Sequence, residues 1–270
     1  MQKIIGRLLL IIIIGLIVLV CYKTFKPVTN MTISATTTTT PSSNLPTGIN
    51  EIEKIHSVVK EYLMSNPEVI IDAIEVLQKR KKQEMDDKVY SYIKENKQEI
   101  ENSITSPYMG NENGDIIIAF FYDYNCSYCK KASHYLNQLI ESDSGVKVIL
   151  KPLPILGESS NYASRIILAI NKIASDKLKP IHENFMALKT ITKESIESLV
   201  TENDLSFAKI EEEADKTEIK DIVNKNFEVA GNLKIHGAPA YIINGRLIPG
   251  LIDSNQLKHV ISEIRANAKK

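Results

Sequence analysis

The sequence predicts an α/β fold in which a small sheet is interrupted by a long helical insertion and preceded by a helical extension. Two observations carry this prediction. Residues 116–122 and 145–152 are apolar strand patterns separated by a helix pattern, which is the order of a parallel βαβ unit. Residues 162–233 are helical in periodicity, and strand patterns return at 240–249 before a closing helix. The chain therefore returns to its sheet after the insertion.

The composition excludes several classes of function. The 270 residues are enough for one sizeable core and an appendage. Lysine plus arginine and aspartate plus glutamate number 33 each, and their charges are interspersed along the sequence. The sequence contains neither a basic stripe nor a glycine-rich phosphate loop, so we expect no nucleic acid partner and no nucleotide chemistry.

Residues 1–27 have the pattern of a signal peptide or of a retained membrane anchor. Lys3 and Arg7 precede an apolar run, Leu8–Val20. A spanning helix needs about 20 apolar residues, and no clear cleavage site follows, so both interpretations stay open. Either one exports the rest of the chain and leaves the positive residues inside. Residues 28–50 are rich in threonine, serine and proline, which predicts a flexible linker.

Residues 51–105 form the predicted helical extension. Its apolar residues recur at helical spacing and form narrow stripes on either side of a break at Ser65-Asn66-Pro67. One interpretation is a stalk or a helix packed on the main domain. The other is an oligomerisation segment, because a narrow stripe needs a partner surface. The stripe residues are Ile52, Ile55, Val59 and Tyr62 before the break, and Val69, Ile70, Ala73, Ile74 and Leu77 after it.

Residues 106–270 form the predicted main domain, with the helical insertion at about 157–233. The boundary lies in Ser106–Gly114, where proline and glycine disfavour regular structure. Near the end of the domain, Asn244-Gly245 predicts a two-residue hairpin turn.

The motif that carries chemistry is Cys126-Ser127-Tyr128-Cys129, directly after the first strand pattern. Asn125 is a good N-cap type, so we expect a helix to begin here with both cysteines on one face, within reach of a disulfide. A helix N-terminus stabilises a thiolate and lowers the cysteine pKa from about 8.5 to between roughly 3.5 and 7. The third cysteine, Cys21, lies in the N-terminal apolar segment, directly after Val20, so a four-ligand zinc site and a disulfide-stapled fold are both disfavoured. The motif favours redox catalysis.

Several further motifs stand in order around this pair. They are Phe120–Lys130 (FFYDYNCSYCK), Pro152–Gly157 (PLPILG), Gly237–Ala240 (GAPA), Leu247–Gly250 (LIPG) and, in the extension, Tyr62–Ile70. Their combination resembles the thioredoxin fold with a DsbA-type helical insertion. The chain is similar, from about residue 49 to its last residue, to exported DsbA-like thiol–disulfide oxidoreductases with an N-terminal helical extension.

The resemblance implies roles for individual residues and no cofactor. Cys126 would be the exposed attacking thiol and Cys129 the resolving thiol of a redox-active disulfide. Pro239 would be the proline that the family holds in cis beside the active site, where it exposes the backbone of Ala238 to an extended substrate segment. An ordinary proline at the entry of a strand is the alternative.

The direction of disulfide exchange depends on the redox potential of the cysteine pair. Ser127 and Tyr128 occupy the dipeptide that tunes the redox potential in the family. Our leading hypothesis is a periplasmic protein-disulfide oxidoreductase that oxidises unfolded, cysteine-containing exported proteins and is reoxidised by a DsbB-like membrane partner. The alternatives are a disulfide isomerase or reductase kept reduced by a DsbD-like partner and, from another class, a soft-metal-binding or holdase protein.

Overall fold

The computed structural model describes residues 49–103 and 105–268. The predicted signal or anchor (1–27) and nearly all of the predicted linker (28–50) lie outside these ranges. Within them, every helix is too short or too polar to span a bilayer. The chain divides after Asn66 into two compact units, and the described part of the first is helix α2 (Ile49–Ser65), nearly all of whose described side chains are exposed.

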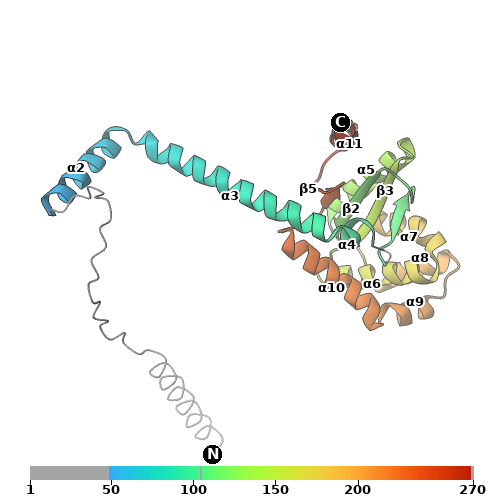
Figure 1. Cartoon of the computed structure of the whole chain (residues 1–270). Helices are drawn as coiled ribbons and strands as arrows, with labels where there is room; N and C mark the ends of the chain where they lie inside the picture. Colours follow the sequence, from blue (N-terminus) through green and yellow to red (C-terminus); the bar gives the residue numbers. More distant parts are fainter. Residues whose placement is uncertain (1–48, 104, 269–270) are drawn as a thin grey trace, which may run out of the picture. The chain divides into compact units, whose positions relative to one another are not determined.

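The second unit is an α/β domain (Figure 1). It begins with α3 (Glu68–Glu95), α4 (Lys97–Glu101), β1 (Tyr108–Gly110), β2 (Ile116–Tyr122), α5 (Ser127–Ser142) and β3 (Val146–Pro152). The helical insertion comprises α6 (Glu158–Ile173), the 3-10 helix η1 (Ser175–Lys177), α7 (Leu178–Ala187), α8 (Lys193–Glu202), α9 (Phe207–Ala214) and α10 (Thr217–Asn232). The chain ends with β4 (Ala240–Ile243), β5 (Arg246–Pro249) and α11 (Ser254–Ala268).

The five strands form one sheet in the order β1-β3-β2-β4-β5. Strands β2 and β3 are parallel and the other neighbours are antiparallel, which confirms the predicted βαβ unit and hairpin. Asn244 and Gly245 both have positive φ, at 43° and 85°, as a two-residue hairpin turn requires. Strand β1 is not predicted by the sequence pattern, because three residues ending in glycine carry no recognisable alternation.

Both faces of β2 are buried, as its unbroken apolar pattern predicts. Alternate residues of this strand belong to two separate clusters. The larger cluster joins the sheet to α5, α11 and the insertion helices α6 to α10, and the smaller one joins its other face to α3, α4 and the end of α10. Residues of β2 in the larger cluster are Ile116, Ile118, Phe120 and Tyr122, and those in the smaller one are Ala119 and Phe121.

Helix α3 packs on the domain only near its C-terminal end, through Val89, Tyr92 and Ile93. Residues 68–88 are exposed apart from the half-buried Val69. Contacts therefore group α3 and α4 with the sheet, whereas the sequence pattern separates residues 51–105 from the domain.

A buried lysine strengthens the junction between α4 and the sheet. Lys151 on β3 is 0% exposed and its Nζ donates to the carbonyl oxygen of Glu99 at 2.6 Å. Burial lowers the pKa of this ammonium group to about 8.

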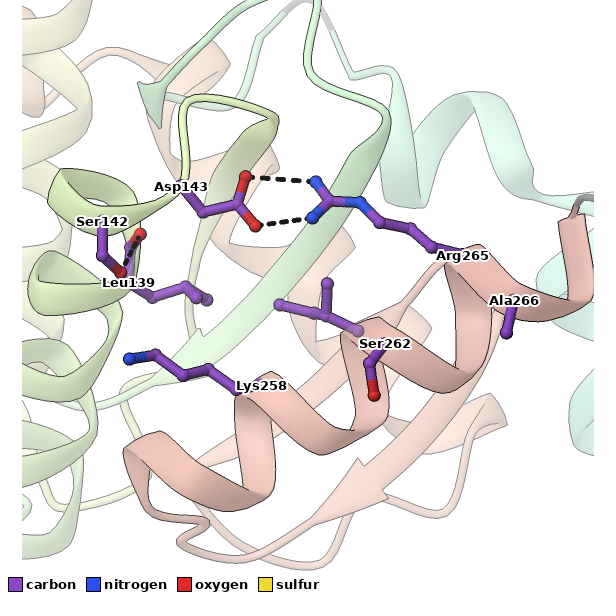
Figure 2. A pocket seen from close by; sticks show the side chains of 8 residues that line it. Leu139, Ser142, Asp143, Lys258, Ser262, Arg265 and Ala266 are labelled. Atoms are coloured by element: carbon purple, nitrogen blue, oxygen red, sulfur yellow. Dashed lines mark hydrogen bonds and ion pairs between the residues drawn. The ribbon is translucent and has the colours of Figure 1, made fainter.

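The end of α5 that lies far from the cysteines is fastened by ion pairs. Arg265 on α11 donates to Asp143, directly after α5, at 2.7 Å (Figure 2), and to Asp115, directly before β2, at 2.7 Å. The guanidinium lowers the pKa of both carboxyl groups. Beside it, Leu139 and Ile261 line an open groove of about 720 Å³ between α5 and α11.

Candidate active site

The two cysteines of the motif lie at the start of α5 in different surroundings. Cys126 is the N-cap residue, with extended backbone angles (φ −81°, ψ 115°), and its sulfur accepts the backbone N–H of Cys129 at 3.3 Å. The interpretation of Asn125 as the N-cap is therefore wrong. Both cysteines are free thiols; Cys126 is 8% exposed and Cys129 is 0% exposed. Cys126 is therefore buried rather than exposed as the resemblance implies, but it keeps a small accessible fraction that Cys129 lacks.

The surroundings move the two thiol pKa values in opposite directions. The pKa of Cys126 is lowered to about 6, chiefly by the hydrogen bond from the Cys129 thiol and then by the backbone N–H groups of Cys129 and Tyr128, against burial and the charge of Asp123. Burial raises the pKa of Cys129, and its hydrogen bond to Cys126 raises it further. At neutral pH the site holds a thiolate beside a protonated thiol.

The second wall of the site comes from the loop before β4. The Cys126 sulfur lies 3.3 Å from the carbonyl oxygen of Ala238, to which it donates when it is protonated, although the two residues are 112 positions apart. The peptide bond between Ala238 and Pro239 is cis, as the resemblance implies. Pro239 is buried and Ala238 is half-buried. The sheet thus brings the two predicted parts of the site together, because β2 leads into Cys126 and the antiparallel β4 begins directly after Pro239.

Several exposed side chains belong to the segments next to Cys126. Ser127 and Tyr128 are both exposed, and the Tyr128 side chain is 59% accessible. The loop between β3 and α6 adds Ile155 and Leu156, which are 44% and 52% exposed. This loop lies beside the cysteines because the backbone N–H of Leu156 donates to the buried carboxylate of Asp123. We call Tyr128, Ile155 and Leu156 the apolar rim.

Two polar residues before the cysteines tie this loop to the helical insertion, and sequence reasoning assigned them no such role. Asp123 is fully buried, and the amide of Asn125 donates to the hydroxyls of Ser159 and Ser160 on α6 at 2.9 Å each. Lys130, on the first turn of α5, donates to the carbonyl oxygen of Leu188 at the end of α7. The sequence signal for these roles is the change from the apolar residues of β2 to a polar residue, Asp123, directly after the strand.

A buried polar chain links β2 and α5 to α7. The hydroxyls of Tyr122 and Tyr124 are 3.1 Å apart, and that of Tyr124 is 2.8 Å from Nδ1 of His182. The other ring nitrogen of His182 is 3.4 Å from the Ser133 hydroxyl, one helical turn after Cys129. Burial lowers the pKa of His182 to about 3, so the ring is neutral. Nothing in the sequence pattern connects His182 to the motif.

The described residues offer no cluster of side chains suited to a metal ion. Within residues 49–103 and 105–268, no three His, Cys, Asp or Glu side chains are grouped so that they could hold one.

Two family models match separate stretches of the chain. The model of the DSBA-like thioredoxin domain matches residues 117–262. The model of the copper resistance protein ScsC N-terminal domain matches residues 53–84, within the predicted extension. No curated protein matches the chain.

Solved structures with the same fold extend the comparison. Proteus mirabilis ScsC in a transitional conformation is 28% identical, with a TM-score of 0.61, over 82% of this chain and 99% of that one. The thiol-disulfide exchange protein alpha-DsbA2 from Wolbachia pipientis is 28% identical, with a TM-score of 0.62, over 66% and 97%. A periplasmic thioredoxin-like protein from Salmonella enterica serovar Typhimurium is 29% identical, with a TM-score of 0.57, over 62% and 93%.

Proposed function

Because the chain belongs to the family of DSBA-like thioredoxin domains and is a thiol–disulfide oxidoreductase, we propose that it forms disulfide bonds in exported proteins through Cys126 and Cys129. The observation that carries the proposal is the contrast between an accessible thiol with a pKa of about 6 and a buried thiol whose pKa is raised. A thiolate of low pKa is a good leaving group, and it stabilises the reduced pair, so the oxidised pair donates its disulfide readily.

The exchange proceeds in two steps. In the oxidised protein, a substrate thiolate attacks the sulfur of Cys126, the Cys126–Cys129 bond breaks, and Cys129 leaves as a thiolate that takes up a proton. A second substrate thiolate then attacks the substrate sulfur of this mixed disulfide and expels Cys126 as a thiolate. Two electrons pass from the substrate to the cysteine pair, and the substrate keeps the new disulfide.

The substrate is an unfolded segment that contains cysteine. The backbone of Ala238 lies 3.3 Å from the Cys126 sulfur and offers a hydrogen-bonding edge to an extended chain. The apolar rim offers contacts to the apolar side chains that an unfolded protein exposes. Ser127 and Tyr128, exposed between the cysteines, tune the potential of the pair.

Continued oxidation requires a partner that accepts the two electrons. We propose a DsbB-like membrane protein for this step, in a periplasmic setting to which the predicted N-terminal signal or anchor delivers the chain. The similarity to a periplasmic thioredoxin-like protein supports this location.

The test is the refolding of a reduced, unfolded disulfide protein together with alkylation of the reduced enzyme at different pH values. We expect the oxidised enzyme to accelerate disulfide formation, Cys126→Ser to be inactive, and Cys129→Ser to accumulate a mixed disulfide in exchange reactions. Alkylation of the wild type should follow a pKa near 6. A pKa near the ordinary thiol value, with no acceleration, contradicts the proposal, and stoichiometric bound copper under these conditions favours the soft-metal alternative.

The helical extension supports a second candidate, a disulfide isomerase or reductase that works as an oligomer. Helix α2 and residues 68–88 of α3 leave their apolar stripes exposed; Ile70 and Ile74 are 49% and 48% accessible. A second copy of the chain covers such stripes best, because identical helices present matching apolar faces. Several active sites held together suit repeated attack on one misfolded substrate, with a DsbD-like partner keeping Cys126 reduced.

Two measurements separate these candidates. Thiol trapping in cells should find the pair mostly oxidised for an oxidase and mostly reduced for an isomerase or reductase. Light scattering on the full chain should show an oligomer that Ile70→Asp combined with Ile74→Asp dissociates. Gln83→Asp, about half a turn away around α3, is the matched control and should leave the oligomer intact. A wild-type monomer contradicts the oligomer proposal.

A further inference from the structure

Asp123 is a buried carboxylate beside the cysteines to which the exchange reaction assigns no step. Its side chain is 0% exposed. Oδ1 accepts the backbone N–H of Asn125 at 2.7 Å and the hydroxyl of Ser160 at 2.7 Å, and Oδ2 accepts the backbone N–H of Leu156 at 2.9 Å. The three donors belong to the loop before Cys126, the first turn of α6 and the loop between β3 and α6. One side chain therefore joins three segments that surround the attacking thiol.

The three hydrogen bonds orient this carboxylate, and all three donors are uncharged. Lys130 on α5 interacts with Asp123 through its charge, but its ammonium group donates to the carbonyl oxygens of Leu188 and Lys189. On the facing strand β4, the phenol of Tyr241 is buried and its pKa is raised by burial, so it stays neutral. The charge of Asp123 acts on the Cys126 sulfur and opposes its thiolate form.

We infer that Asp123 is a positioning residue for the redox pair: it holds the loop of Cys126 against the start of the insertion, and its charge moderates how strongly the pair oxidises its substrates. This inference rests on the proposed function of Cys126 as the attacking thiol. The helix N-terminus and the neighbouring N–H donors favour the Cys126 thiolate, and a negative charge beside it opposes them. The charge of Asp123 raises the pKa of Cys126, which agrees with this direction.

Three variants of the full chain test the inference through the pH dependence of Cys126 alkylation. Asp123→Asn keeps the shape, removes the charge and gives up one of the two acceptor oxygens, so the pKa of Cys126 should fall by about 0.5 to 1. Ser160→Ala keeps the charge and removes one donor, so the pKa should rise by about 0.3. Asp176→Asn makes the same chemical change at an exposed position of η1 and should leave the pKa where it is. Opposite shifts from two neighbouring variants are not expected from a purely structural role.

The equilibrium with glutathione provides the second readout. At pH 7, Asp123→Asn should shift it about three- to tenfold towards the reduced enzyme, because a more stable thiolate makes the pair more oxidising. An unchanged or raised Cys126 pKa in Asp123→Asn overturns the inference. If Asp123→Asn does not fold, the Ser160→Ala variant alone tests the inference. An unchanged Cys126 pKa in Ser160→Ala then overturns it. Loss of the proposed function would appear differently, as an ordinary thiol pKa in the wild type.

Discussion

Helices α3 and α6 carry the same kind of apolar stripe, yet the chain covers only one of them. On α6, Ile167 and Ile170 are 0% exposed, because the sheet and the other insertion helices pack over them. On α3, Ile70 and Ile74 remain about half exposed. Helical periodicity therefore identifies a face that needs to be covered, whereas the cover itself comes from tertiary contacts in one helix and, as we propose, from a second copy in the other.

The sharpest test of this comparison is to remove the same atoms from each stripe. Ile167→Ala should lower the free energy of unfolding by about 2 to 4 kcal/mol, because it leaves a cavity in a packed core. Ile74→Ala should change it by less than about 0.5 kcal/mol when the chain is diluted to a monomer, because the side chain is already half in water. Urea denaturation at low protein concentration measures both. Equal losses would mean that α3 is covered within the monomer.

The insertion helices, whose apolar faces are covered, also bury His182, a group that titrates. We therefore expect the stability of the domain to depend on acid pH. Unfolded histidine takes up a proton near pH 6.5, whereas folded His182 does so only near pH 3. The unfolded chain therefore binds the extra proton between these values, and stability falls as pH falls from about 6.5 to 3. Between pH 7 and 5 this group should cost about 2 kcal/mol.

His182→Gln is the variant that isolates this effect. Glutamine still offers a hydrogen bond to Tyr124 but does not titrate, so its stability should depend less on pH between 7 and 5. Urea midpoints at a series of pH values measure the difference, and parallel curves for the two proteins would contradict the assignment to His182.

The smallest expected effect lies at the far end of α5, where ion pairs fasten the closing helix. Arg265 bonds two carboxylates (Asp143 in Figure 2), so Arg265→Ala should cost about 1 to 2 kcal/mol. The pKa values of Asp115 and Asp143 are lowered, so this contribution is present at neutral pH and is lost as pH falls below about 4. Arg246→Ala removes a single exposed ion pair to Glu263 and should cost less than about 0.5 kcal/mol. Thermal unfolding of both variants compares them.

Local patterns were sufficient for much of the fold. The apolar run of β2, the strand after α5 and the turn at Asn244-Gly245 are each recognisable within about ten residues. The βαβ unit followed from the order of these patterns along the sequence. Strand β1 was beyond such reasoning, because its pairing with β3 supplies what its three residues lack. Asn125 looked like an N-cap, but its side chain bonds α6 instead, and the sulfur of Cys126 caps the helix.

The sequence by itself determined the chemistry of this protein: two cysteines three positions apart after a buried strand, and a Gly-Ala-Pro loop before the last hairpin. Only the tertiary structure decided how the two thiols differ. Cys126 and Cys129 are the same residue type on one helical turn, and their pKa values move apart because one sulfur receives hydrogen bonds at the helix N-terminus while the other is buried. Ser160 and Ala238 reach that environment from distant points of the chain, Ser160 through its hydrogen bond to Asp123. Such contacts depend on how the sheet and the insertion pack, which no local pattern encodes.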